Sequence, residues 1–408
     1  MEKVNIPSGL IPRDHYLTAF EPFINHSLIK VLTGQRRVGK SYFLYQLMQQ
    51  IQLRFSDANV IYINKEDFTF DGIRNAADLH QFVKGNTRKD VKNYLFIDEI
   101  QDIEDFERAI RSFFLNDQYD LYITGSNANL LSGELSTYLS GRYIEFRIYS
   151  LSYPEFLMFQ NLENTNENLM SYLRYGGMPY LHRLKQEDEV VFEYLDSLLS
   201  AIIYKDVVKR YGVRNTRFLD QLVHFLAGHT GSIFSSKSIS DFLKSQRLNM
   251  APNQVQTYTN YLCNAFLIQR SERYDLEGKR IFETGEKYYF ENLGLRNAIA
   301  GFKPSDMNQL IENAIFNHLC FHGYEVKTGQ IGKLEVDFVA EKQNEKLYIQ
   351  AAWRLDSQKT IDREFNNLRK IPDHYPKLVV SLDDFEGNSI EGIRHVRLKD
   401  FLSTAPER

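Results

Sequence analysis

The sequence predicts an α/β protein in which a parallel sheet is followed by a helical region, a small helical unit with a β-hairpin, and a mixed α/β region. In the first third, short β-branched runs alternate with amphipathic stretches, which is typical of a parallel sheet covered by helices on both faces. From Leu151 the pattern turns helical, and strands return after about Pro304. A chain of 408 residues is long enough for several cores. We therefore expect four domains, at residues 1–150, 151–216, 217–303 and 304–408.

The first domain is expected to contain five strands with helices between most of them. The strand candidates are short apolar runs at Ile29–Thr33, Val60–Asn64, Tyr94–Asp98, Leu121–Thr124 and Tyr143–Ile148. A helix is expected directly after the first strand, at Lys40–Arg54.

Composition limits the location and the partners of the chain. The formal net charge of −4 gives no overall signature of nucleic-acid binding, so any such contact would need a local basic patch. Cys263 and Cys320 each lie in an apolar helical pattern, which predicts two reduced, buried thiols. The sequence shows no signal-peptide core at its start and no apolar run near the roughly 18 residues that a membrane span needs. We expect a soluble cytoplasmic protein.

A phosphate-binding loop is predicted between the first strand and the helix that follows it. The residues GQRRVGKS match the pattern G-x-x-x-x-G-K-[ST] at every fixed position. Glycines let main-chain N–H groups approach a polyphosphate closely, and the helix N-terminus adds a favourable dipole. The lysine would bridge the β- and γ-phosphates, and the serine hydroxyl would hold Mg²⁺. The eight residues are Gly34, Gln35, Arg36, Arg37, Val38, Gly39, Lys40 and Ser41.

Two adjacent carboxylates end the apolar strand in the segment YLFIDEIQ. Asp98 at the strand tip would order Mg²⁺ through its water shell, and Glu99 is placed to act as general base toward the attacking water. The alternative is that both are solvated turn residues, but the upstream loop favours the catalytic interpretation.

Two later segments predict further catalytic residues. In LYITGSN a strand ends in small polar residues, and a polar side chain there can lie between the γ-phosphate and the water; Asn127 is the first candidate and Ser126 the second. Arg142 precedes the next strand and can reach a γ-phosphate, including that of a neighbouring subunit. An ordinary turn and a surface salt bridge are the respective alternatives.

With these segments together, the chain resembles AAA+ ATPases. Gly34–Ser41, Tyr94–Gln101 and Thr124–Asn127 carry the resemblance, and Ser140–Arg142 is similar to the arginine-finger box of that superfamily. The chain also resembles a prokaryotic group that combines a P-loop AAA+ module, a helical lid with a GG-x-P segment (here at Gly176–Pro179), a winged helix and a nuclease-like domain. The resemblance implies ATP, Mg²⁺ and a nucleotide-dependent lid movement, and it allows a homo-oligomer.

The third domain has the pattern of a winged helix. Helices are expected at Phe218–Ala227, Ser236–Ser245 and Pro252–Phe266, then strands at Leu267–Tyr274 and Arg280–Glu283. Its recognition helix would expose amides and a hydroxyl, which can bond base edges or phosphates: Asn253, Gln254, Gln256, Thr257 and Asn260. Positive charge would come from Lys237, Lys244, Arg247, Arg270, Arg273, Lys279 and Arg280, and from the basic stretch Lys205–Arg217. These features favour DNA; protein contacts are the alternative.

The C-terminal domain resembles the restriction-endonuclease-like core, in which a helix glutamate, a strand aspartate and a following [EQ]-x-K hold a divalent metal and activate water. Glu312, Glu335, Asp337 and Gln350 match in type and order, but Ala352 stands at the lysine position. Without that ammonium, and with neutral glutamine, metal binding and water activation should weaken. Lys346 or Arg354 could substitute, although nothing in the spacing demands it. An inactive domain retained for DNA or protein binding is favoured.

These observations leave three functions open. The first is an ATP-hydrolysing switch or remodeller that acts on DNA. The second is a signalling or scaffold ATPase that binds protein partners. The third is an ATP-regulated nuclease, which the altered C-terminal motif disfavours.

Overall fold

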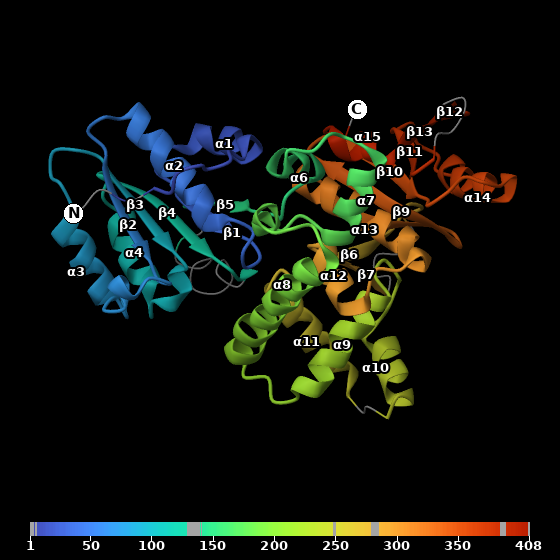
Figure 1. Ribbon diagram of the computed structural model, residues 1–408, viewed down its shortest axis with the longest axis horizontal. Helices are drawn as coiled ribbons and strands as arrows, with labels where there is room; N and C mark the ends of the chain where they lie inside the picture. Colours follow the sequence, from blue (N-terminus) through green and yellow to red (C-terminus); the bar gives the residue numbers. More distant parts are fainter. Residues whose placement is uncertain are drawn as a thin grey trace. The chain divides into compact units, whose positions relative to one another are not determined.

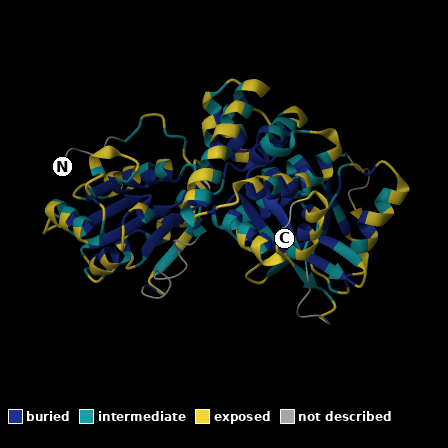
Figure 2. Cartoon of the chain, turned by 90° about the horizontal axis from the view of Figure 1, so that it is seen from below, coloured by how far each residue is buried: buried dark blue, intermediate teal, exposed yellow. Residues whose placement is uncertain are grey.

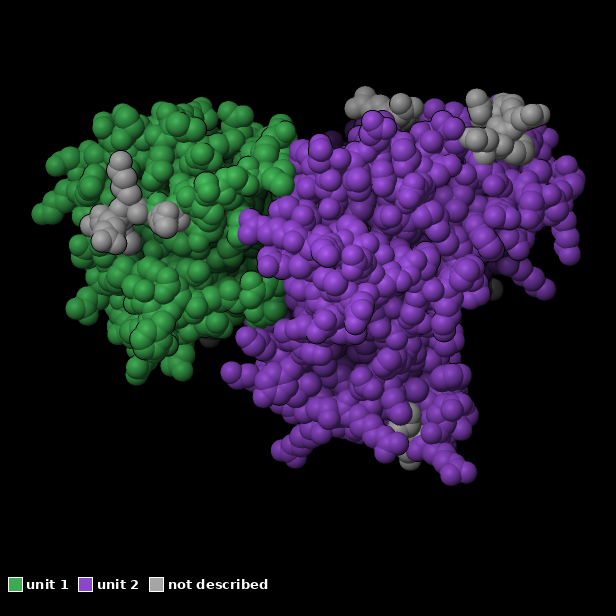
Figure 3. All heavy atoms as spheres, viewed as in Figure 1, with its two compact units in different colours: residues 1–149, 264–266 green, residues 150–263, 267–408 purple. Residues whose placement is uncertain are grey.

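The computed structural model describes residues 4, 6–128, 139, 141–247, 250–278, 285–383 and 389–406. The chain forms two compact units, coloured separately in Figure 3. One unit contains residues 1–149 and 264–266, and the other contains residues 150–263 and 267–408. Each unit is described by itself below.

A five-stranded parallel sheet forms the centre of the first unit (Figure 1), which confirms the predicted parallel α/β fold. The strand order β2-β3-β4-β1-β5 places β4 between β3 and β1. The carboxyl ends of these three strands therefore meet at one edge of the sheet. The strands are β1 (Ile29–Thr33), β2 (Asn59–Asn64), β3 (Asn93–Asp98), β4 (Tyr119–Gly125) and β5 (Tyr143–Arg147).

Helices cover both faces of this sheet. Successive side chains of a strand point to opposite faces, and in these strands apolar side chains occur on both faces. Ile29 and Val31 of β1 belong to the cluster that packs against α3 (Ala76–Asn86) and α4 (Phe106–Phe114). On the other face lie α1 (Asp14–Phe20) and α2 (Lys40–Arg54), where aromatic rings pack, including Phe20, Phe43, Phe96 and Tyr122. The three inner strands β1, β3 and β4 are buried along their whole length, as expected for parallel strands covered on two sides, and buried strands appear dark blue in Figure 2.

The second unit begins with helices. The helices near its start are α6 (Tyr153–Gln160), α7 (Asn166–Tyr175) and α8 (Asp188–Ala201). Ser152 and Glu155 form a capping box that fixes the start of α6. The sequence predicts one helix over Glu187–Tyr211, but α8 ends at Ala201 and a π-helix follows at Ile202–Lys209. Hydrophobic spacing does not separate these two helix types, because both place apolar residues on one side.

Three helices and an antiparallel strand pair follow, in the predicted order. They are α9 (Thr216–Gly228), α10 (Ser236–Ser245), α11 (Pro252–Asn264), β6 (Ile268–Asp275) and β7 (Glu286–Phe290). The second hairpin strand was expected at Arg280–Glu283, which lies outside the described residues; β7 starts after it. A further helix, α12 (Leu293–Ala300), was not expected, and Asn292 caps its N-terminus.

The hairpin β6–β7 continues into the C-terminal sheet. The eight strands run in the order β12-β13-β11-β10-β9-β8-β6-β7, and β6 pairs in parallel with β8. The sheet is mixed, because β8, β9 and β10 are antiparallel neighbours whereas β10, β11 and β13 are parallel. The added strands are β8 (Glu325–Ile331), β9 (Leu334–Lys342), β10 (Glu345–Ala351), β11 (Lys377–Ser381), β12 (Ser389–Ile390) and β13 (Ile393–Arg397).

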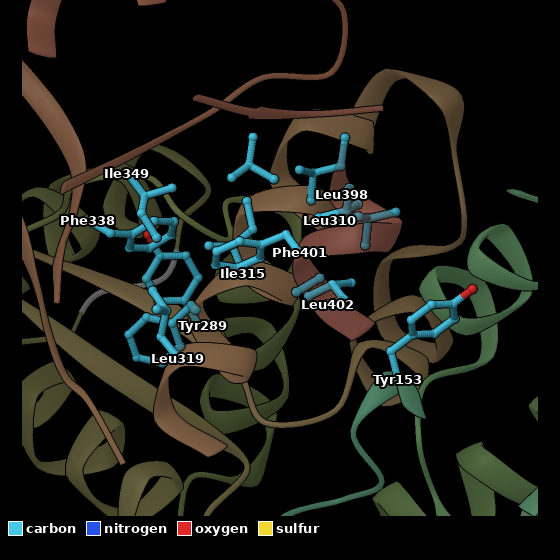
Figure 4. Packing of buried hydrophobic residues seen from close by; sticks show 14 of the residues in the cluster. Tyr153, Tyr289, Leu310, Ile315, Leu319, Phe338, Ile349, Leu398, Phe401 and Leu402 are labelled. Carbon is cyan, nitrogen blue, oxygen red and sulfur yellow. The ribbon is translucent and has the colours of Figure 1, made fainter. Parts of the chain in front are cut away.

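A large core of the second unit lies between this sheet and its helices α13 (Met307–Phe321) and α15 (Leu398–Ser403). Tyr289 from β7 lies with Phe338 and Ile349 in that core (Figure 4). The helix α14 (Gln358–Arg369) packs a separate cluster around Phe365 on the same sheet. In the described part of the chain, every helix is too short or too polar to span a bilayer.

Candidate active site

The loop between β1 and α2 has the backbone that a phosphate-binding loop needs. Gly34 has φ 145°, and a Cβ there would lie 2.2 Å from the main-chain oxygen of Ile148. Gly39, the N-cap of α2, has φ 97°, where L side chains are disfavoured. Arg37 adopts φ 69° without being glycine, so the loop holds one strained residue. The two glycines of the motif are therefore required by packing and by conformation.

The side chain of Lys40 lies inside this loop. Its Nζ donates to the main-chain oxygens of Gly34 (3.0 Å) and Gln35 (3.1 Å). It also lies 3.7 Å from Glu99 Oε1, and the lysine side chain is 4% exposed. The cation of the loop thus lies beside the acid that follows β3.

The carboxylate of Asp98 sits at the end of β3 and is buried. Its Oδ1 accepts from the Thr124 hydroxyl, and its Oδ2 from the Tyr62 hydroxyl at 3.4 Å. Burial raises the pKa of Asp98, and hydrogen bonds from Ser41 and Thr124 partly oppose this shift. Ser41 at the start of α2 and Asp98 therefore present their oxygens to each other.

Glu99 follows in a left-handed backbone conformation, with φ 54°. Burial would raise the pKa of its carboxyl, but the charge of Lys40 and a hydrogen bond from Gln101 hold the pKa below its usual value. The main-chain nitrogen of Glu99 donates to Thr124 Oγ1 at 3.0 Å. A deprotonated carboxylate held by donors beside a buried lysine can accept a proton from water.

The polar end of β4 lies beside these acids. Ser126 and Asn127 are both buried, at 0% and 3% exposed. The Ser126 hydroxyl is close enough to contribute to the lowered pKa of Glu99. Sequence reasoning placed Asn127 first and Ser126 second; the geometry brings Ser126 to the carboxylate, and the role of Asn127 stays a prediction.

Arg142 lies at the opposite edge of the sheet. It immediately precedes β5, and its main-chain oxygen accepts from Ile29 at the start of β1. The phosphate loop follows the far end of β1, which has five residues, so the two edges are roughly 15 Å apart. The guanidinium is exposed and lies 5.7 Å from the centre of the Phe114 ring. Arg142 therefore does not join the site of its own chain.

Residues that contact the loop but were not singled out from the sequence include Arg13, Phe266 and Glu66. The buried guanidinium of Arg13 donates to the main-chain oxygens of Val38 (3.2 Å) and Tyr149 (3.0 Å). Gln35 is fully buried and donates from Nε2 to the Phe266 oxygen. Arg36 pairs with Glu66 at 3.2 Å. No motif identifies such partners, because they come from segments far apart in the sequence.

In the second unit, the residues named from the nuclease resemblance lie around a partner that the sequence did not indicate. Glu312 of α13 and Glu335 and Asp337 of β9 all lie close to the ammonium of Lys287 in β7. Gln350 of β10 accepts from the Asp337 main-chain nitrogen at 3.4 Å. Lys346 does not substitute for the missing lysine, because its Nζ pairs with Glu341 at 2.8 Å. The guanidinium of Arg354 lies over the Trp353 ring.

The predicted recognition helix exposes fewer polar groups than expected. Gln256 is half-buried, accepts from the Ser236 hydroxyl and donates to Asn260, whose oxygen also accepts from Arg270. The prediction that Gln256 and Asn260 are exposed is therefore wrong, because both are half-buried and hydrogen-bonded within the fold. Asn253, Gln254 and Thr257 are exposed, as predicted. Arg270 also pairs with Glu286, and Arg273 bonds Gln330, so both arginines are engaged within the fold. Lys279 and Arg280 lie outside the described residues.

Two family models match parts of the chain, and two relatives match most of its length. Residues 26–157 match a model described as an AAA domain, and residues 166–306 match a domain of unknown function. An uncharacterised protein of Haemophilus influenzae is 34% identical over 97% of this chain and 99% of its own length. A second uncharacterised protein, from Methanocaldococcus jannaschii, is 31% identical over 80% of this chain and 75% of its own length.

Among solved structures, the Aeropyrum pernix ORC1 protein in complex with DNA aligns over 73% of this chain and 94% of that chain, at 11% identity and a TM-score of 0.34. At this TM-score the likeness carries no information about function.

Proposed function

The chain belongs to the same family as its Haemophilus influenzae and Methanocaldococcus jannaschii relatives and matches an AAA domain at residues 26–157, and on this premise we propose that it is an AAA+ ATPase that binds and hydrolyses ATP with Mg²⁺ at the carboxyl edge of its parallel sheet. The observation that carries the proposal is the meeting of Lys40 with Glu99. Their charged atoms lie 3.7 Å apart inside a buried site. An ammonium and a general base are thereby held at the same strand edge, beside a loop shaped for phosphates.

The triphosphate would lie along the loop. Main-chain N–H groups at the start of α2 face a bound anion, and the helix dipole favours negative charge there. Lys40 now donates to two loop oxygens; a bound β- or γ-phosphate would offer the ammonium oxygens of higher charge. Charge-assisted hydrogen bonds of this kind contribute about 1.5–3 kcal/mol each.

Mg²⁺ fits the residues beside the loop. The Ser41 hydroxyl and the Asp98 carboxylate face each other, and hydroxyl, carboxylate and water oxygens are the ligands that Mg²⁺ prefers. When bound, the ion would neutralise charge on the β- and γ-phosphates. Ser41 would hold it directly, and Asp98 would order its water shell.

Glu99 would then orient the attacking water and take its proton. Because the pKa of Glu99 is held low, the carboxylate is ionised at neutral pH and can accept that proton. Ser126 or Asn127, at the end of β4, would contact the γ-phosphate or the water.

Equilibrium titration with a fluorescent ATP analogue and Mg²⁺ tests the proposal. Lys40→Ala should weaken binding by at least about tenfold, because a loss of 1.4 kcal/mol corresponds to a factor of ten. Lys92→Ala is the matched control, because Lys92 lies just before β3 at the opposite edge and its Nζ donates to the Asp117 main chain. Unchanged affinity in a folded Lys40→Ala protein, or no affinity in the unaltered chain, would refute the assignment.

A second function, DNA binding by the α9–α11 region, is favoured by one packing contact. The Tyr211 ring stacks on Tyr261 of α11 with centroids 3.8 Å apart. This contact brings the basic stretch Lys205–Arg217 beside the predicted recognition helix. Exposed cations and exposed amides thus adjoin on one part of the second unit, which suits phosphate attraction with base contacts. The exposed cations of the stretch are Lys205, Lys209, Arg214 and Arg217.

A mobility-shift assay with and without ATP separates DNA binding from a role limited to protein partners. Replacing Lys205, Lys209 and Arg217 by glutamine should weaken DNA binding and flatten its dependence on salt. The matched control replaces Lys359 and Lys370, which are exposed near α14 in the same unit. If the unaltered chain binds no DNA near physiological salt, the protein-binding alternative takes its place.

A further inference from the structure

A buried lysine lies at the centre of the acidic cluster in the second unit. The side chain of Lys287, in β7, is 2% exposed. Its Nζ lies 2.6 Å from Glu312 Oε1, 2.7 Å from Glu335 Oε1 and 3.6 Å from Asp337 Oδ1. These carboxylates come from α13 and β9. The carboxylates of two different elements therefore converge on one ammonium that a third element supplies.

Two other donors contact the carboxylates of the cluster. The Tyr289 hydroxyl donates to Glu312 Oε1 at 2.6 Å, and it lies on the same face of β7 as Lys287. The main-chain nitrogen of Ala351 donates to Asp337 Oδ2 at 2.9 Å. Gly231 closes the cluster from another side, because a Cβ there would lie 3.0 Å from Glu312 Oε1.

Electrostatics keeps the lysine charged in spite of its burial. Desolvation alone would lower the pKa of Lys287, but the carboxylates of Glu312, Asp337 and Glu335 raise it well above its usual value. Burial and the charge of Glu312 raise the pKa of Asp337. A buried cation paired with several acids is stable only as a set, since removing one partner leaves an uncompensated charge.

The resemblance to restriction-endonuclease-like domains implies a divalent metal at these positions, and the residues present do not fit one. A metal needs carboxylate oxygens that are free to coordinate it. Here one oxygen each of Glu312 and Glu335 and both oxygens of Asp337 already lie beside the ammonium, the Tyr289 hydroxyl or the Ala351 N–H. Of the His, Cys, Asp and Glu residues that the structure describes, no group of three or more is arranged to hold a metal ion.

An alternative is that Lys287 replaces the lysine missing at Ala352 and restores a catalytic site. In that case the ammonium would lie to one side of the carboxylates, where it could position water on a metal held between them. It instead occupies the point where Glu312 and Glu335 converge, with nearly equal distances to both.

We propose that the Lys287 ammonium is the resident cation of this cluster: it takes the place of a divalent metal, excludes Mg²⁺ and Mn²⁺ from the acidic residues, and fastens β7 to the C-terminal α/β layer. The cluster is then an ion network centred on the lysine, and its carboxylates form a potential metal site that the lysine occupies. Removal of the ammonium, with the carboxylates left in place, should open that site to a metal.

Mn²⁺ binding to the full chain without nucleotide tests this directly, with free Mn²⁺ measured by electron paramagnetic resonance. Lys287→Met removes the charge and leaves an unbranched side chain that is one atom shorter, so we expect it to bind one more Mn²⁺ per chain than the unaltered protein. That additional ion should be lost again when Glu335→Gln or Asp337→Asn is combined with Lys287→Met. Lys287→Arg keeps a cation and should behave as the unaltered protein does.

Two results would overturn the proposal. One is Mn²⁺ binding by the unaltered chain that Glu335→Gln or Asp337→Asn abolishes, or Mn²⁺-dependent DNA cleavage that Asp337→Asn abolishes. The other is a folded Lys287→Met protein that binds no additional Mn²⁺. If Lys287→Met does not fold, the unaltered chain and its Glu335→Gln and Asp337→Asn variants still decide the outcome, because they report whether the cluster binds metal with its lysine in place.

Discussion

The hydroxyl of Thr124 joins the two acids of the candidate active site: Thr124 Oγ1 donates to Asp98 Oδ1 and accepts from the main-chain nitrogen of Glu99. Thr124 lies in β4, which separates β3 from β1 in the sheet. One side chain therefore sets the position of both the carboxylate proposed to order Mg²⁺ and the backbone that carries the proposed base.

Thr124→Val should slow ATP hydrolysis and reduce stability. Valine has nearly the same shape but leaves a buried carboxylate oxygen and a buried N–H without their partner, which costs about 1–3 kcal/mol. Steady-state turnover and thermal unfolding measure the two effects. Thr124→Ser keeps the hydroxyl and is the control; equal turnover in the valine and serine variants would contradict the bridging role.

Glu99→Gln should bind ATP and fail to hydrolyse it. Glutamine keeps the shape but cannot take a proton, and general-base catalysis contributes on the order of 10²–10⁴-fold to a rate. Nucleotide affinity should stay close to that of the unaltered chain, because Lys40 and the loop are unchanged. Single-turnover assays separate chemistry from product release, and a normal rate in them would reject Glu99 as the base.

The sequence predicted the parts of the phosphate-loop site that lie on contiguous motifs, and it missed residues of that site and of the acidic cluster in the second unit that depend on tertiary contacts. Gly34–Ser41, Asp98 and Glu99 follow from local patterns whose spacing fixes their place at strand ends. Arg13 and Lys287 carry no such pattern, because a lone cation in an extended segment looks the same whether it contacts a loop, an acid or water. Their partners lie at least 25 residues away in the chain.

The same division explains the fold. All five strands of the first sheet were predicted, since each is a short apolar run between turn signals. The π-helix at Ile202–Lys209 and the parallel pairing of β6 with β8 were not predicted. Both features depend on tertiary packing between segments that are distant in the sequence. The periodicity of apolar residues within one segment does not specify that packing.

Arg142→Ala should abolish ATP hydrolysis if the chain assembles so that one copy completes the site of the next. The position of Arg142 at the sheet edge opposite the phosphate loop excludes a role within the same chain. An arginine supplied from a neighbour contributes on the order of 10³–10⁵-fold to the rate in related chemistry. Turnover per chain should also rise with protein concentration in the unaltered protein.

Mixing provides the control for this prediction. Arg142→Ala carries an intact Lys40, whereas Lys40→Ala carries an intact Arg142, so mixed assemblies should recover part of the activity that each variant lacks alone. If Arg142→Ala hydrolyses ATP normally, Arg142 has no catalytic role, and the alternative interpretation as a surface salt-bridge residue holds.

Mild acid should destabilise the second unit through His318. Burial, and then the nearby His322, lower the pKa of His318 from 6.5 to about 3 in the folded chain. Its Nε2 lies 3.0 Å from the Thr404 oxygen, and its ring packs 5.1 Å from that of Phe401. The unfolded chain takes up the proton first, at about pH 6.5. The contribution of neutral His318 is therefore complete above pH 6.5 and is lost as pH falls toward 3.

Each pH unit below 6.5 should cost about 1.4 kcal/mol of unfolding free energy from this group alone. Urea unfolding at pH 7.5 and pH 5.0 measures the loss, which other titrating groups also affect. The difference between the unaltered chain and His318→Gln isolates the histidine, because glutamine can still donate to the Thr404 oxygen but does not titrate. The variant should lose roughly 2 kcal/mol less than the unaltered chain between these pH values. An equal loss in both would show that His318 is hydrated or protonated in the folded chain, contrary to its buried position.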